Sequence, residues 1–211
     1  MDLGLPVKWA TFNLGASKPE EFGNYYAWGD EVQKVNFATN TYKHMAATVG
    51  IDNMTKYQAA DGNTNAIWYE NGVFVGDGKT TLEPVDDPAS ILWGGAWRSP
   101  TAEEWAALQN TDLFTWTWTD NYNGLGVSGS IVTSKITGYV GNKIFIPAAG
   151  YKNGNSAAQQ GQYGLYWTAS LNTADSAKAL TATTGPADSD ISIADFVFRT
   201  VGQSIRPVYA E

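Results

Sequence analysis

The chain has 211 residues, with 13 Lys+Arg against 21 Asp+Glu and a formal net charge of -8 at pH 7. Charged residues make up 16% of the sequence, whereas ordinary globular domains carry about 25%. A nucleic-acid binder needs a basic surface, and only three arginines are present, so we expect no nucleic-acid partner. No apolar stretch approaches the roughly 20 residues of a membrane span.

Cysteine is absent and histidine occurs once. The sequence therefore excludes disulfides, thiolate catalysis, zinc–thiolate sites and any site that needs two histidines. The length suits a single domain over residues 1–211. The first residues, Met1-Asp2-Leu3-Gly4, lack the basic and apolar regions of a signal peptide.

The first half of the chain predicts short elements around a long loop. Residues 7–14 alternate in hydrophobicity and predict a strand. Ser17 and Glu20 predict a capping box that opens a short helix. Residues 32–82 read as a loop-rich insertion, with one hairpin whose arms are residues 67–69 and 73–75.

The second half predicts two more helices and then strands. Asp87-Pro88 begins a helix that ends at Trp93-Gly94-Gly95, and Thr101 with Glu104 forms a second capping box whose helix ends near Asn110. Strands are expected at residues 114–118, 131–139, 143–147, 164–170, 191–201 and 204–209. This order of elements predicts an α+β fold.

Catalytic motifs are mostly missing. The histidine, His44, lies in a polar stretch, and no Gly-x-Ser-x-Gly motif accompanies it. The glycine-rich segment 124–129 lacks the preceding strand and following helix of a dinucleotide site. Glycosidases need two carboxyls facing each other about 5–10 Å apart, whereas the acidic residues here are mostly sequence neighbours that point apart. A glycosidase-like hydrolase is kept as a distant alternative.

A metal site is only weakly indicated. Residues 61–65 resemble the start of a calcium loop, but Ala66 and Gly72 stand where an EF-hand needs glycine and glutamate. Another oxygen-ligand Ca²⁺ site stays open as an expectation, and the spacing names no ligand set.

Several fragments resemble one bacterial family. They are residues 2–6, 8–11, 15–21, 25–29, 86–87, 93–101 with Glu104, 146–150, 166–170 and 204–208. The most specific fragment is Trp93-Gly94-Gly95-Ala96-Trp97-Arg98-Ser99-Pro100-Thr101. Together they are similar to the "major paralogous domain" (FISUMP) family found on surface lipoproteins of gut and rumen bacteria.

The resemblance implies a C-type-lectin-like fold, related to formylglycine-generating enzymes and to the variable proteins of diversity-generating retroelements. It implies that residues 9–12 lie beside residues 205–208, because the terminal strands of this fold pair. Formylglycine-generating enzymes work through cysteines, and this chain has none. We therefore expect no enzymatic activity. The Glu-Pro-Asn motif of calcium-dependent lectins is replaced by Glu83-Pro84-Val85. Arg98 is expected in a buried structural role, and Trp93, Trp97, Trp105 and Trp167 in the core.

The resemblance also draws attention to residues 171–201, the stretch that varies in retroelement-diversified relatives. If residues 191–201 form a half-buried strand, its two side-chain sets face opposite ways. The aliphatic set is the better core set: Ile191, Ile193, Val197 and Val201. The outward set would then contact a ligand, with Asp195 joining it at a bulge and a preceding turn beside it. The expected ligand-binding residues are Leu171, Asn172, Asp175, Ser176, Ser192, Ala194, Asp195, Phe196, Phe198 and Thr200. The alternative reverses the parity and buries both phenylalanines.

These points lead to the expectation of a non-catalytic, surface-displayed ligand-binding module of the adhesin or receptor type. Its binding face would be diversified by a retroelement, and its partner would be a protein or a glycan. We expect an extracellular or cell-surface location, with the leader or anchor outside this sequence. The alternative function is a structural or tip domain of a bacterial surface assembly.

Overall fold

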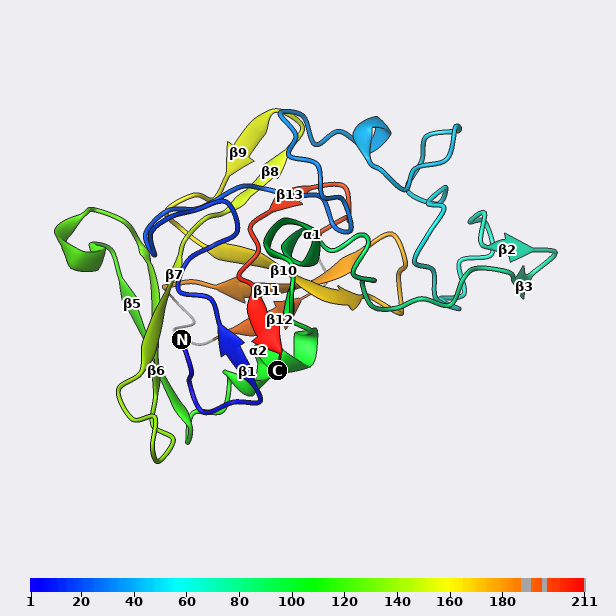
Figure 1. The fold of residues 1–211 in the computed structure, drawn as a ribbon. Helices are drawn as coiled ribbons and strands as arrows, with labels where there is room; N and C mark the ends of the chain where they lie inside the picture. Colours follow the sequence, from blue (N-terminus) through cyan, green and yellow to red (C-terminus); the bar gives the residue numbers. More distant parts are fainter. Residues whose placement is uncertain (187–190, 195–196, 211) are drawn as a thin grey trace.

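The computed structural model describes residues 1–186, 191–194 and 197–210. Within them, the named strands pair antiparallel in four three-stranded sheets and one hairpin (Figure 1). The sheets are β1 (Val7–Trp9), β14 (Val208–Ala210) and β4 (Trp97–Arg98); β5 (Phe114–Thr119), β6 (Gly129–Ser134) and β7 (Lys143–Pro147); β10 (Gly164–Leu171), β11 (Ala179–Thr184) and β12 (Ser192–Ala194); β13 (Gly202–Gln203), β8 (Tyr151–Asn153) and β9 (Ser156–Ala158); and the hairpin of β2 (Tyr69–Glu70) and β3 (Val73–Phe74).

The helices are few and short. They are α1 (Pro88–Trp93), α2 (Ala102–Ala107) and the 3-10 turns η1 (Thr39–Thr41) and η2 (Tyr122–Gly124). Short helices with antiparallel sheets agree with the α+β class. In the part of the chain that the structure describes, no helix combines the length and apolarity needed to cross a membrane.

The first and last strands pair as expected. Trp9 lies opposite Val208 in β1 and β14, and the amide of Ala10 donates to the carbonyl of Pro207 at 2.9 Å. Trp9 and Val208 are buried against Trp105 of α2. This packing ties the two ends of the described chain into one sheet.

Both helix caps expected at α1 and α2 are present. The Asp87 side chain accepts from the amide of Ala89 at the start of α1. Thr101 and Glu104 exchange side-chain bonds with each other's amides in a complete capping box. Such caps satisfy amides that the first helical turn leaves without partners.

The expected helix after Ser17 is absent. Glu21, rather than Glu20, accepts from the amide and hydroxyl of Ser17. Gly23 then turns the chain at a φ of 70°, which leaves no room for a helical turn.

Several strand boundaries also differ from expectation. Strand β6 ends at Ser134 rather than at residue 139, and β11 was not expected at all. The segment 191–201 is not one continuous strand: β12 covers only Ser192–Ala194, and Phe198 forms an isolated bridge with Lys178.

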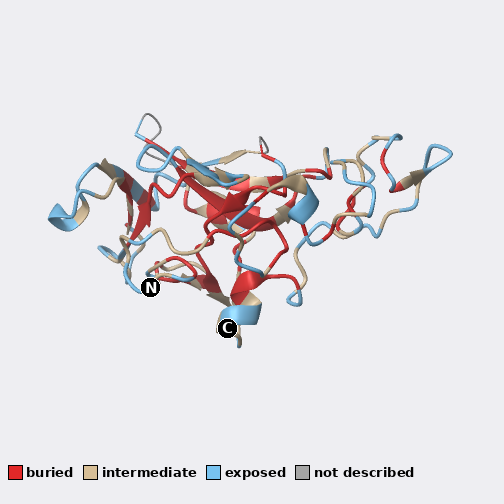
Figure 2. Ribbon diagram, turned by 90° about the horizontal axis from the view of Figure 1, so that it is seen from above, coloured by how far each residue is buried: buried red, intermediate tan, exposed pale blue. Residues whose placement is uncertain are grey.

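The insertion projects from the body, and its buried side chains form a small core together with residues of the body (Figures 1 and 2). The expected hairpin forms, with Asn71 and Gly72 at φ values of 52° and 78°, as a turn of two left-handed residues requires. Beneath it, Met54 and Trp68 are buried in a cluster that also contains Ala177 from the body. The insertion is therefore packed directly against the region expected to bind a ligand.

Candidate functional site

The aromatic ring of Phe198 stands at the surface where residues 197–201 run beside the start of β11. Phe198 is 38% exposed, whereas its neighbours Val197 and Arg199 are buried. The Lys178 ammonium lies 5.9 Å from the Phe198 ring centroid and 3.1 Å from an Asp175 carboxylate oxygen. The structure therefore brings an aromatic ring, a cation and a carboxylate together at one place on the surface.

The loop that supplies Asp175 is closed by its own hydrogen bonds. The amide of Asn172 donates to the carbonyl of Lys178 at 3.2 Å, and the amide of Lys178 donates to the carbonyl of Asp175 at 2.9 Å. Thr173 and Ala174 are exposed at the tip of this loop. The loop is thus a compact turn with a small polar surface.

Hydrogen bonds from the insertion fix the buried side of this loop. Asp61 accepts from the amide of Ser176 at 2.9 Å, and the Ser176 hydroxyl accepts from the amide of Ala59 at 2.9 Å. Ser176 is consequently fully buried. The Asp61 side chain and the Ala59 amide, more than 110 positions earlier in the chain, therefore fix the position of the loop.

Arg199 anchors the other segment of the site. Its guanidinium donates to the carbonyls of Lys56 and Tyr57 at 3.0 and 2.9 Å and contacts the Met54 sulfur. Its amide donates to the carbonyl of Ala177 at 3.1 Å. Burial lowers the pKa of this guanidinium. Arg199 therefore joins three segments: the insertion, the 172–178 loop and the segment 197–201 that presents Phe198.

A second part of the expected face lies along β12. Ser192 is exposed, and it pairs with the partly exposed Thr183 of β11. Ala194 is half-buried on the same side. Ser192 pairs with Thr183 and Phe198 with Lys178, so the two residues lie near opposite ends of β11. Asp195 and Phe196, which stand between them in sequence, lie outside the described residues.

For four of the residues expected to contact a ligand, the prediction is wrong, because their side chains are not at the surface. Leu171, Asn172, Ser176 and Thr200 are all buried. Leu171 packs with Trp167 in the core, and the Asn172 side chain accepts from the amide of Ala174. These residues shape the loop from inside rather than presenting side chains to solvent.

The aliphatic set of residues 191–201 lies inward, as the parity argument expected. Ile191, Val197 and Val201 are buried, and Ile193 is partly buried against the core. Phe198 is exposed in agreement with the same argument, whereas Thr200 is not. The register between β11 and its neighbour shifts by one residue between the Ala194 and Phe198 pairings, so strict alternation does not hold across the whole segment.

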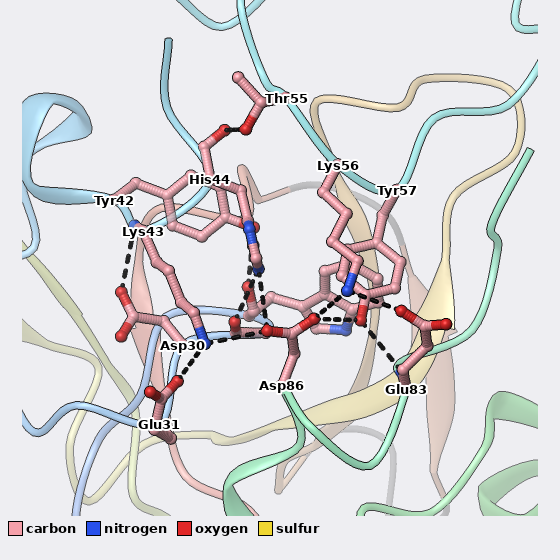
Figure 3. A network of polar contacts seen from close by, with 12 residues as sticks. Asp30, Glu31, Tyr42, Lys43, His44, Thr55, Lys56, Tyr57, Glu83 and Asp86 are labelled. Carbon is pink, nitrogen blue, oxygen red and sulfur yellow. Dashed lines mark hydrogen bonds and ion pairs between the residues drawn. The ribbon is translucent and has the colours of Figure 1, made fainter. Parts of the chain in front are cut away.

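A charged network fastens the insertion to the body (Figure 3). The buried Asp86 carboxylate accepts hydrogen bonds from Lys56 and the Tyr57 hydroxyl and pairs with Lys43 at 2.9 Å. Lys43 also pairs with Glu31, and Lys56 with Glu83. Lysines of the insertion therefore bridge carboxylates that flank it in sequence.

This network controls two titratable groups. Burial opposes the charge on Asp86, but the bonds from Lys56, Lys43 and Tyr57 outweigh it and hold the pKa of that carboxyl well below its usual range. Burial lowers the pKa of His44, and the nearby Asp86 carboxylate offsets only part of that effect. The His44 ring lies 3.0 Å from the carbonyl of Gly29, a buried structural contact.

The calcium-like segment uses its carboxylate internally. Asp61 accepts from the amide of Asn63, from the Trp68 indole and from the amide of Ser176. Over the described ranges, no group of three or more histidine, aspartate or glutamate side chains is arranged to hold a metal ion.

Four tryptophans were expected in the core and Arg98 in a buried structural role, and the structure confirms only part of this. Trp105 and Trp167 are buried, while Trp93 and Trp97 are only partly buried. Arg98 is not buried: it is about one-third exposed and forms a two-pronged pair with Glu104.

Comparisons of the chain with protein families, curated proteins and solved structures find no match.

Proposed function

We propose that this domain is a non-catalytic ligand-binding module of the adhesin or receptor type, displayed at a bacterial surface. The observation that carries the proposal is the outward-facing ring of Phe198 between two buried neighbours. Exposed rings beside polar groups are favourable contacts for both proteins and glycans, since they offer area with little loss of conformational freedom. The Lys178 and Asp175 side chains add charges of both signs next to the ring.

The framework below the ring supports a binding face that tolerates sequence change. Arg199, Ser176 and Asp61 hold the segments through buried hydrogen bonds to the main chain. Thr173, Ala174, Asp175, Lys178, Ser192 and Phe198 project from that framework and are exposed or partly exposed. Substitution of Thr173, Ala174, Lys178, Ser192 or Phe198 leaves these bonds in place, whereas the Asp175 carboxylate also accepts from the amide of Ala177. We therefore propose a C-type-lectin-like domain of the major paralogous domain family, whose 171–201 face is diversified by a retroelement.

Sequencing sister copies of the locus tests the diversification. We expect substitutions to concentrate at positions 173–175, 178, 192–196 and 198 and to spare Arg199, Ser176 and Val201. Substitutions spread evenly along the chain, or concentrated outside residues 171–201, would contradict the proposal.

Binding itself is tested with a printed glycan array and a panel of purified host-surface glycoproteins. Phe198→Ala should abolish the binding that the unaltered domain shows. Tyr163→Ala is the matched control, because Tyr163 has the same exposed fraction, 38%, and lies just before β10, away from the Lys178 end of β11. Equal loss of binding in both variants, or retention in Phe198→Ala, contradicts this assignment of the site.

A further inference from the structure

The fold places α1 beside the sheet of the terminal strands, and a second apolar surface is built there. We call it the α1 face and define it by Phe12, Val85, Ile91, Leu92, Trp93, Trp97 and Tyr209. Val85, Ile91 and Leu92 are exposed, and the four aromatic residues are partly exposed. The α1 face shares no residue with the 171–201 site.

The aromatic residues of the α1 face form a continuous row. Trp93 contacts Phe12 at a ring-centroid distance of 5.7 Å and Trp97 at 4.9 Å, and Trp97 contacts Tyr209 at 5.3 Å, all edge to face. The turn after α1 creates this row, because Gly94 and Gly95 both adopt positive φ values, of 65° and 61°. That backbone, which favours glycine, brings Trp97 back against Trp93.

A groove lies directly beside the exposed ridge of α1. Its volume is about 510 Å³, and it is lined by Pro84, Val85, Ser90, Ile91, Gly95, Ala96, Trp97, Arg98 and Ala210. Leu92 follows the groove residue Ile91 near the end of α1 and is 53% exposed. A projecting apolar helix beside an apolar groove is the shape that a two-fold interface needs, because each copy offers both halves of the contact.

The charges around the groove are mostly compensated within the domain. Arg98 pairs with Glu104, and Asp87 is buried and accepts from the amide and hydroxyl of Ser99. Asp86 is held by lysines on the insertion side. Two copies of a chain with a net charge of -8 repel each other. The repulsion between two docked copies is smallest where the acidic groups of the contact surface are buried or paired. The α1 face meets that requirement.

We propose that the α1 face is a self-association surface, on which a second copy of this chain docks in a two-fold arrangement. The ridge of Ile91 and Leu92 on each copy would enter the groove between Val85 and Trp97 on the other. The centre of the α1 face is rich in tryptophan and tyrosine and poor in charged residues. This composition is typical of the core of a protein–protein interface. A sugar ligand fits this groove less well, because the Ser90 hydroxyl and the Arg98 guanidinium already have partners inside the domain.

Sedimentation and light scattering over a concentration series test the proposal. The unaltered chain should reach twice its monomer mass of 22.8 kDa, and Leu92→Lys should weaken the association at least tenfold. Leu125→Lys is the matched control, because Leu125 is 55% exposed, close to the 53% of Leu92, but lies after η2 in the connection from β5 to β6, a segment that Figure 1 shows away from α1. An unaltered chain that stays monomeric at every concentration overturns the proposal, as does a dimer that Leu125→Lys breaks and Leu92→Lys does not.

A distance measurement keeps the proposal testable if Leu92→Lys fails to fold. The chain has no native cysteine, so Leu92→Cys and Leu125→Cys can each carry one spin label. The dimer should give a shorter label-to-label distance at position 92 than at position 125. The reverse order, or no distance at position 92, places the contact on another face. Neither result depends on what the 171–201 site binds.

Discussion

The guanidinium of Arg199 lies over the indole ring of Trp28, with 5.5 Å between its central carbon and the ring centroid. The same guanidinium donates to carbonyls of the insertion at residues 56 and 57. One buried side chain thus connects the body, the insertion and the segment that presents Phe198. The stability of the candidate site should depend on it.

Replacing Arg199 by lysine should destabilise the fold by about 3 kcal/mol. An ammonium cannot reproduce the planar fork that reaches two carbonyls and the Met54 sulfur. Urea unfolding measures the difference. Arg98→Lys is the control, and its partly exposed pair with Glu104 should cost less than about 1 kcal/mol. Equal costs at the two positions would mean that the buried contacts of Arg199 carry no special weight.

Alanine substitutions at the adjacent residues Val197 and Phe198 should change the free energy of unfolding by different amounts. Val197→Ala removes buried methyl groups next to Val201 and should cost about 1–3 kcal/mol. Phe198→Ala should change the free energy of unfolding by less than about 1 kcal/mol, because Phe198 is 38% exposed and lies outside the core clusters of buried residues. Thermal and urea unfolding of both variants provide the measurement. A larger cost for Phe198→Ala would show that its ring is a core contact and would argue against the binding face.

Acid should loosen the attachment of the insertion. His44 has a lowered pKa in the folded state, so the unfolded chain takes up its proton first and stability falls as pH drops below about 6.5. Asp86 also has a lowered pKa in the folded state. Its contribution is present above the unfolded value near 3.8 and is lost as pH falls further. Both groups therefore make the domain less stable in acid.

Urea midpoints between pH 7 and pH 3 test this dependence. Asp86→Asn should lower stability at pH 7 by about 3 kcal/mol, because Lys43 and Lys56 lose their shared partner. It should also flatten the pH dependence below pH 4. Asp112→Asn, at an exposed position, is the control and should keep the acid slope of the unaltered chain. An acid slope that survives in Asp86→Asn would assign it to other carboxylates.

Calcium should not stabilise the segment that resembles a calcium loop. Both oxygens of Asp61 already accept hydrogen bonds from the protein, and both oxygens of Asp77 accept from amides of residues 57 and 58. We expect melting temperatures in millimolar CaCl₂ and in EDTA to agree. A rise of several degrees with calcium, removed by Asp61→Asn, would reveal an ion site here.

Local signals in the sequence were sufficient for several elements. The Thr101–Glu104 capping box and the Asn71-Gly72 turn specify their structures through contacts within four residues. The strand at residues 143–147 was predicted with its observed bounds. By contrast, β11 consists mainly of alanine and threonine. Its apolar content is too low to indicate a strand, and its pairing with β10 and β12 determines the structure.

The candidate site shows why distant contacts could not be predicted. The turn at residues 171–176 has small polar residues typical of an exposed loop, yet Ser176 is buried by Ala59 and Asp61 of the insertion. The sequence contains no local sign of that contact. The Ser17–Glu20 motif failed for a local reason instead: Glu21 reaches the same serine, and Gly23 reverses the chain before a helix can form.

The pairing of β1 with β14 makes this domain suited to transplantation. Val7 and Ala210 are direct partners in the sheet, and such partners have Cα atoms about 5 Å apart. A carrier protein could therefore accept the domain within one of its surface loops without its own backbone being pushed apart. A circularly permuted version, with a short linker joining these strands and new ends opened in an exposed turn, should fold for the same reason. The 171–201 face would remain uninterrupted in both arrangements, since none of its described segments contributes to the seam between the terminal strands.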